Sequence, residues 1–169
     1  PIDFVPLSGT LTWAAGATGV QTAGVPVVDD VIDEMDETFS VLLSESSSGT
    51  SVPVGGSSAI ATIVDNDTSN VAIAGAVTVD EDGGVAVIDV TLSTPSWEVV
   101  TIGYSTSFGS ATAGDFTAIA SGTLTFGVGS TVRSIVVDIL DDNIAETVEN
   151  FSVGISIVSG TTGSVTSAT

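Results

Sequence analysis

An internal repeat constrains the fold of this chain more than any other feature of its sequence. The stretch SGTLTW at residues 8–13 returns as SGTLTF at 121–126, and DDVIDEMDETFSV at 29–41 returns as DDNIAETVENFSV at 141–153. The two offsets, read from the residue numbers, are 113 and 112. A period near 112 residues is too long for a solenoid repeat and suits an independent β-sandwich domain. The sequence therefore predicts tandem copies of one domain.

The repeat also predicts where the copies begin and end. Residues 1–67 correspond to the C-terminal half of a domain, residues 68–70 to a linker, and residues 71–169 to a domain that lacks its last strand. The junction DNDTSN at 65–70 is short and polar, so we expect little slack between the copies. Because the chain begins with Pro1 rather than Met, we expect it to be part of a longer or processed protein.

Alternation of apolar and polar residues predicts that the copies are all-β. Residues 85–92 read VAVIDVTL. Every second residue of this segment is apolar, and in a strand these side chains would lie on one face, which we expect to be buried. The residues expected on inward faces are Ala86, Ile88, Val90, Leu92, Val100, Ile102, Tyr104, Ile135, Val137, Ile139, Phe151, Val153, Ile155 and Ile157. Short runs of this kind, separated by Gly, Ser, Thr and Asn, are typical of antiparallel sandwiches. We therefore expect tandem immunoglobulin-like sandwiches, with the first copy partial.

One segment allows a helix instead. In VIDEMDETF at 31–39, Val31, Met35 and Phe39 lie four residues apart and would share a helical face. Dense like charge at this spacing destabilises a helix, however, and Phe39 already begins the strand-like alternation FSVLL. We expect a loop with at most one helical turn.

Acidic residues dominate the chemistry of the chain. There are 21 Asp and Glu residues, and Arg133 is the only Lys or Arg, so the formal charge is −20. All acids except Glu45, Asp89, Glu98 and Asp138 fall in predicted turns and loops. Alternate loops of an antiparallel sandwich gather at one end, where uncompensated carboxylates would repel and raise one another's pKa values.

A divalent cation would relieve this repulsion. Ca²⁺ accepts six to eight oxygen ligands in irregular loops, whereas Mg²⁺ demands a tighter octahedron. The segments DNDTS and DEDGG resemble the start of an EF-hand loop, but neither continues with the Glu that such a loop needs. The prediction is therefore a calcium site built from converging loops.

The same composition excludes several other functions. The chain has no His and no Cys, which removes the usual groups of zinc sites, disulfides and histidine-assisted nucleophiles. Nucleic acid is not an expected partner, because binding it depends on basic side chains. No apolar run is long enough for membrane insertion. Paired carboxylates also serve glycosidases, but aromatic residues make up only 5% here, and we expect no enzyme.

Five segments, in order along the chain, together resemble the Calx-β domain, a calcium-binding sandwich of sodium–calcium exchangers that recurs in adhesins and bacterial surface proteins. They are DDVIDEMDETFSVLL at 29–43, ATIVDND at 61–67, VDEDGGVAVIDVTLS at 79–93, SATAGDFTAIASGTLTF at 110–126 and DDNIAETVENFSVGI at 141–155. The resemblance covers essentially the whole chain.

The resemblance implies two sets of calcium ligands, each incomplete. The set implied for the first copy is Asp3, Asp29, Asp30, Glu34, Glu37, Asp65 and Asp67. The set implied for the second copy is Glu81, Asp115, Asp141, Asp142, Glu146 and Glu149. The second copy has Asn143, Ala145 and Val148 where the first has Val31, Asp33 and Asp36, so we expect it to bind fewer or weaker ions.

The function implied is structural. We expect a repeat of a large extracellular or cell-surface protein of bacteria, such as an adhesin, a surface-layer protein or a filament, stiffened by Ca²⁺ and in contact with neighbouring repeats or subunits. Two alternatives remain open at this point. One is a calcium-sensing regulatory tandem, and the other is a subunit that polymerises by strand donation.

Overall fold

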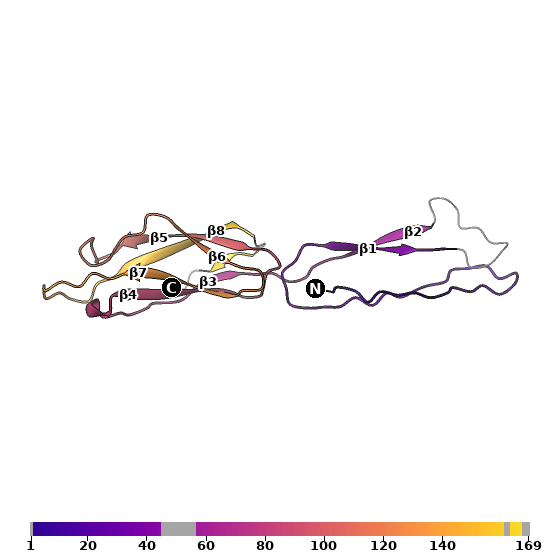
Figure 1. Ribbon diagram of the computed structural model, residues 1–169, viewed down its shortest axis with the longest axis horizontal. Helices are drawn as coiled ribbons and strands as arrows, with labels where there is room; N and C mark the ends of the chain where they lie inside the picture. Colours follow the sequence, from indigo (N-terminus) through magenta and orange to yellow (C-terminus); the bar gives the residue numbers. More distant parts are fainter. Residues whose placement is uncertain (1, 45–56, 161–162, 167–169) are drawn as a thin grey trace. The chain divides into compact units, whose positions relative to one another are not determined.

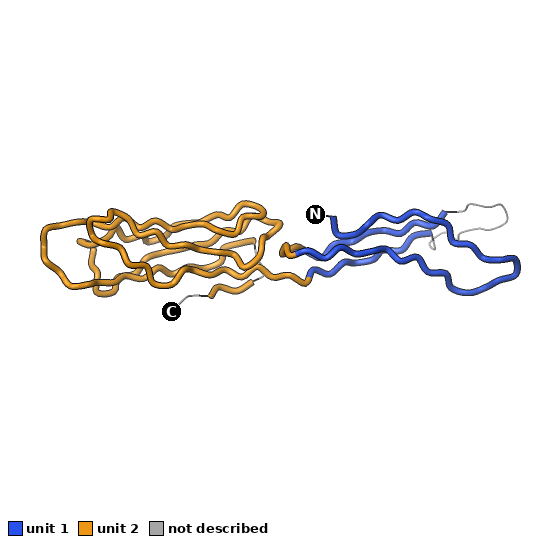
Figure 2. The backbone as a smooth tube through the Cα atoms, turned by 90° about the horizontal axis from the view of Figure 1, so that it is seen from below, with its two compact units in different colours: residues 1–30, 35–65 blue, residues 31–34, 66–169 orange. Residues whose placement is uncertain are grey.

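The computed structural model describes residues 2–44, 57–160 and 163–166, which form strands joined by loops (Figure 1). The chain divides into two compact units (Figure 2). Unit 1 consists of Pro1–Asp30 and Met35–Asp65, and unit 2 consists of Val31–Glu34 and Asn66–Thr169. Residues 31–34 therefore belong to unit 2 although the segments that precede and follow them in the sequence belong to unit 1.

The described residues of unit 1 contain one two-stranded antiparallel sheet. Strand β1 (Glu37–Leu42) pairs with β2 (Ser58–Ile63), with Phe39 opposite Ala61 and Val41 opposite Ala59. A single bridge joins Phe4 to Val27. The all-β prediction is confirmed here.

Unit 2 is a sandwich of two sheets. The first has the order β7-β4-β3-β9, formed by β3 (Val71–Ile73), β4 (Val85–Leu92), β7 (Val132–Asp138) and β9 (Val165–Thr166). The second has the order β6-β5-β8, formed by β5 (Val100–Phe108), β6 (Gly122–Phe126) and β8 (Phe151–Ser159). All pairings are antiparallel except that of β3 with β9.

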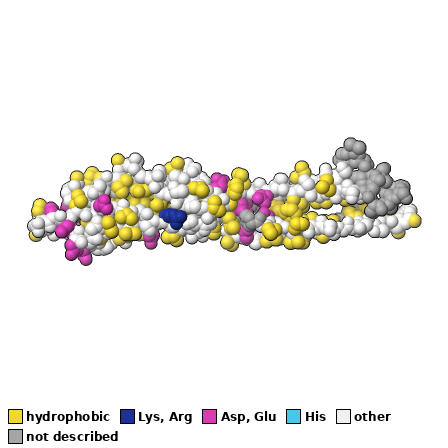
Figure 3. All heavy atoms as spheres, viewed as in Figure 1, with side chains coloured by type: hydrophobic (Ala, Val, Ile, Leu, Met, Phe, Trp, Pro, Cys, Tyr) yellow, Lys and Arg dark blue, Asp and Glu magenta, His cyan; other side chains and the backbone are white. Residues whose placement is uncertain are grey.

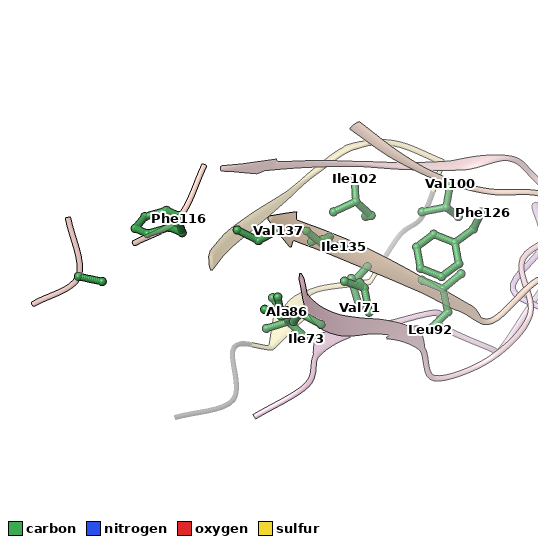
Figure 4. Close-up of a cluster of buried hydrophobic side chains, with 13 residues drawn as sticks. Val71, Ile73, Ala86, Leu92, Val100, Ile102, Phe116, Phe126, Ile135 and Val137 are labelled. Carbon is green, nitrogen blue, oxygen red and sulfur yellow. The ribbon is translucent and has the colours of Figure 1, made fainter. Parts of the chain in front are cut away.

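The buried core of the described residues lies between the sheets of unit 2 (Figure 4). Every second residue of β4 is buried, as its sequence predicted. Ile135 and Val137 of the neighbouring strand β7 lie beside these residues in the same sheet, and Val100 and Ile102 come from β5 of the other sheet. The predicted inward residues of β8 are half-buried. Burial of these side chains, at about 25 cal/mol per Å², is the main force that holds the sheets together.

The two units repeat the same local geometry at an offset of 112 residues. Phe4 bridges to Val27 in unit 1, and Phe116 bridges to Ile139 in unit 2. The Phe4 ring stacks on Phe39 at a centroid distance of 4.6 Å, and the Phe116 ring stacks on Phe151 at 4.4 Å. The repeat in the sequence is therefore also a repeat in the structure.

The segment that allowed a helix is a loop, as expected. Residues 31–36 are not helical, and β1 begins at Glu37. The one helix among the described residues is a single 3-10 turn, η1 (Glu81–Gly83). None of the described helices has the length and apolar character needed to cross a bilayer.

Candidate metal sites

Three carboxylates from three separate loops meet at one end of unit 2. Glu81, Asp115 and Glu146 each place a carboxylate oxygen within 4.8 Å of the other two. Glu81 precedes β4, Asp115 lies between β5 and β6, and Glu146 lies between β7 and β8. These loops lie at the same end of the sandwich (Figure 1). We call these three residues the second acidic group.

Local hydrogen bonds fix the position of Asp115. The backbone N–H of Thr112 donates to its carboxylate, and the Thr112 hydroxyl donates to the same oxygen at 2.9 Å. These bonds, backbone first, lower the pKa of Asp115. The N–H of Leu140 donates to the Asp115 carbonyl at 2.9 Å, which joins this loop to the start of the acidic loop of unit 2, residues 139–150 between β7 and β8. The next residue, Phe116, is buried in the core, and this anchors the turn.

The turn η1 brings Glu81 to the same place. Gly84, which ends η1, has a φ of 74°, a left-handed conformation that glycine adopts without strain. Its carbonyl accepts a hydrogen bond from Ile139 N–H at 3.0 Å, so η1 is tied to the segment just before the acidic loop. Glu81 is half-buried in this position.

The acidic loop of unit 2 adds further carboxylates to these surroundings. Partial desolvation, followed by the charges of Asp115, Asp142 and Glu81, raises the pKa of Glu146. Partial desolvation and a hydrogen bond to Asp115 raise the pKa of Glu149. The free carboxylates therefore repel one another, as the sequence predicted for converging acidic loops.

The only basic residue of the sequence does not compensate this charge. The Arg133 guanidinium donates to the backbone carbonyls of Thr125 and Val132, each at 3.0 Å. On the face shown in Figure 3, acidic side chains gather at the loop end of unit 2, and the basic side chain lies over the strands. A bound cation would neutralise the second acidic group where the chain itself supplies no positive charge.

Unit 1 repeats part of this arrangement, since Asp3 is the counterpart of Asp115. Val28 N–H donates to the Asp3 carbonyl at 2.8 Å, the counterpart of the bond from Leu140 to Asp115. This pairing sets Asp3 beside Asp30, with carboxylate oxygens within 4.8 Å. A hydrogen bond to Asp3, together with the charge of Asp3, raises the pKa of Glu37. Asp3, Asp30 and Glu37 are the residues that we call the first acidic group.

The remaining residues implied as ligands differ in their surroundings. Glu34 is half-buried and belongs to the segment 31–34 of unit 2. Asp65 is half-buried, and its backbone N–H donates to Asp36 Oδ1 at 3.1 Å. Asp29 and Asp141 are exposed, Asp67 is half-buried in unit 2, and Asp142 Oδ1 accepts the Ile144 N–H at 2.6 Å.

Two acids that were not among the predicted ligands have defined structural roles. Asp33 is 4% exposed, and its Oδ2 accepts the backbone N–H of Ser69 at 3.1 Å. Asp36 accepts the N–H of Asp65. One feature of the sequence distinguishes these two acids from the others. The second copy has Ala145 and Val148 at the corresponding positions, so the two acids are specific to the first copy.

The donor set of the second acidic group fits a hard cation. All the ligand atoms are carboxylate oxygens, which favours Ca²⁺ or Mg²⁺ over metals that prefer nitrogen or sulfur. Two oxygens bound to one Ca²⁺ at roughly 2.3–2.6 Å lie at most about 5 Å apart, which agrees with the separation within the group. Loop carboxylates that accept mono- or bidentate binding suit Ca²⁺ better than the strict octahedron of Mg²⁺.

Comparisons with known proteins identify related sequences and folds. The family model described as the Calx-beta domain matches residues 1–67 and 72–168. The crystal structure of the apo-form Calx CBD1 domain is 25% identical, with a TM-score of 0.52 over 60% of this chain and 88% of that chain. The Calx CBD2 domain is 25% identical (TM-score 0.48; 52% and 54% covered), and the calcium binding domain CBD12 of CALX1.1 is 26% identical (0.42; 45% and 32% covered). No curated protein sequence matches the chain.

Proposed function

The chain belongs to the Calx-beta domain family, and on this premise we propose that it is a calcium-binding structural module. The observation that carries the proposal is the convergence of Glu81, Asp115 and Glu146 from three loops onto one point without a basic partner. Glu149, hydrogen-bonded to Asp115, is the fourth ligand that we assign to this site. Membership of the Calx-beta family supports calcium as the ion.

Calcium acts in this proposal by linkage to folding. The carboxylates are held together only in the folded state, so bound ions stabilise that state by RT ln(1 + [Ca²⁺]/Kd). This amounts to about 2.7 kcal/mol when free calcium is a hundredfold above Kd. Extracellular modules have Kd values of roughly 10⁻⁴ to 10⁻³ M. We propose that the module lies outside cells or on the cell surface, where calcium reaches this range, as a repeat of a larger bacterial adhesin, surface or filament protein.

The test is thermal unfolding of the whole chain in calcium and in chelator. We expect a higher melting temperature in calcium, with an increase that grows with calcium concentration. Glu146→Gln removes one ligand of the second acidic group, and Glu34→Gln changes the residue of the first copy that corresponds to Glu146. Each substitution should reduce the increase in melting temperature that calcium causes. Asp89→Asn, which changes an exposed acid within strand β4 rather than in a loop, is the matched control and should keep the full response. Identical melting curves in calcium and chelator would refute the proposal.

The concentration at which calcium acts separates this module from a sensor. A structural module responds in the range from about 0.1 to 1 mM, whereas intracellular sensors respond at roughly 10⁻⁷ to 10⁻⁵ M. Isothermal titration of the chain measures this value directly. A Kd in the micromolar range would assign the tandem to calcium sensing and would remove the argument for an extracellular location.

A further inference from the structure

Asn150 joins the loop that follows β5 to the end of the acidic loop of unit 2. It lies immediately before β8, at the point where the ladder between β5 and β8 has ended. Asn150 Oδ1 accepts the Ser110 N–H at 3.3 Å, Asn150 N–H donates to Ser110 Oγ at 2.9 Å, and the Asn150 carbonyl accepts the Ala111 N–H at 3.0 Å. We call this arrangement of Ser110, Ala111 and Asn150 the loop clasp.

Gly109 makes the close approach of Asn150 possible. A Cβ at Gly109 would collide with both Oδ1 and the carbonyl oxygen of Asn150. The φ of Gly109 is not positive, so this glycine is needed for the space that it leaves and not for its backbone conformation. The first copy has Thr38 at the position of Asn150, so the amide side chain is a feature of the second copy.

The loop clasp lies next to carboxylates of both loops. Glu149, which is hydrogen-bonded to Asp115, is the residue before Asn150. Asp115 follows Ala111 in the same loop, and this part of the loop is held at both ends, because Ala111 is 5% exposed and Phe116 is 1% exposed. The loop clasp is therefore the contact that fixes the end of the acidic loop against the loop of Asp115.

We propose that Asn150 is a positioning residue of the calcium site, which keeps Glu149 beside Asp115 before the ion binds. This inference rests on the proposed function, because it concerns the affinity of the same site. Carboxylates that repel one another separate when their loops are free to move, and a site that is only partly in its binding geometry has a Kd raised by the inverse of that fraction. The loop clasp opposes the separation with neutral hydrogen bonds and adds neither a ligand nor a charge.

The experiment is a calcium titration of the whole, isotope-labelled chain, followed by NMR at the backbone amides of Asp115 and Glu146. Asn150→Ala removes the acceptor of the Ser110 N–H. We expect the Kd measured at these two amides to rise about three- to tenfold, as the loss of one hydrogen bond predicts. The amide of Asp3, in unit 1, is the internal control, and its response to calcium should be the same in the variant and the parent.

Two further variants separate positioning from general stability. Ser110→Ala removes the hydroxyl that accepts the Asn150 N–H and should raise the same Kd by a similar factor. Ser134→Ala is the matched control, because it removes a side-chain hydrogen bond of 2.7 Å to Asp89 between strands β7 and β4, and it should leave the Kd unchanged. In chelator, Asn150→Ala should also speed hydrogen exchange at the Ala111 amide, whose own acceptor is a backbone carbonyl that the substitution retains.

The outcomes distinguish this inference from the proposed function. A parent chain whose Asp115 amide does not respond to calcium refutes the proposed function and the positioning role together. Calcium binding by the parent with an unchanged Kd in Asn150→Ala overturns the positioning role alone. An equal rise of Kd in Asn150→Ala and Ser134→Ala also overturns it, because the effect would then follow stability in general. A raised Kd in Asn150→Ala and Ser110→Ala only, with faster exchange at Ala111, supports it.

Discussion

Replacement of Asp33 by Ala should destabilise unit 2 although Asp33 lies in the acidic loop of the first copy. The side chain is 4% exposed, and its carboxylate accepts the N–H of Ser69, a residue with no exposed surface. The backbone of Asp33 also bonds to unit 2, since its N–H donates to Pro95 O at 3.0 Å and its carbonyl accepts Trp97 N–H at 3.2 Å. Removing the carboxylate therefore deprives a buried donor of a charged acceptor.

The expected cost follows from the loss of the bond between Ser69 N–H and the Asp33 carboxylate. Loss of a hydrogen-bond partner from a buried group costs about 1–3 kcal/mol, with charged partners at the upper end. We therefore expect Asp33→Ala to lower the free energy of unfolding of unit 2 by about 2–3 kcal/mol. For a domain of this size, that corresponds to roughly 8–12 °C in melting temperature. Asp33→Asn keeps an acceptor oxygen and should cost less than half as much.

The assay is urea unfolding followed by the fluorescence of Trp97, in a Trp13→Phe background and in chelator. Trp97 follows Ser96, the residue that bridges to Asp33, and it becomes the only Trp of the chain. Asp29→Ala, an exposed acid of the same loop, is the control and should change stability by less than about 0.5 kcal/mol. Equal effects of Asp33→Ala and Asp29→Ala would refute the structural role of Asp33.

Further predictions concern the stacked rings and the acidic loops. Phe116→Ala should destabilise unit 2 by about 3–5 kcal/mol, because the ring is 1% exposed, and Phe4→Ala should cost less because its ring is only half-buried; calorimetric unfolding compares them. Without calcium, the raised pKa values of Glu146 and Glu149 mean that the folded state holds protons more tightly than the unfolded state. Their contribution should therefore make the chain less stable as pH rises from about 4.5 through the raised values. Replacing both by Gln should flatten that part of a pH–melting curve, and calcium should oppose the loss.

The strands were predictable from the sequence because their signal is local. Alternation of apolar residues in β4 is written into eight consecutive positions, and the structure buries the predicted ones. The strand β9 carried no such signal, since it is two residues long and its pairing with β3 depends on residues far away in the sequence. The burial of Asp33 was equally hidden, because its partners Ser69 and Ser96 meet it only after the chain has folded.

Two acids of the first copy's acidic loop accept hydrogen bonds from the backbone. The segment DDVIDEMDETF of the first copy contains more Asp and Glu residues than the corresponding segment DDNIAETVENF of the second copy. The sequence alone therefore suggested more calcium ligands in the first copy. Two of the additional acids, Asp33 and Asp36, instead accept backbone N–H groups of Ser69 and Asp65. What the copies share is the set at equivalent positions, in which Asp3, Asp30, Glu34 and Glu37 correspond to Asp115, Asp142, Glu146 and Glu149. We therefore expect these two acids to serve the fold, and calcium titration of Asp36→Ala should leave the number of bound ions unchanged.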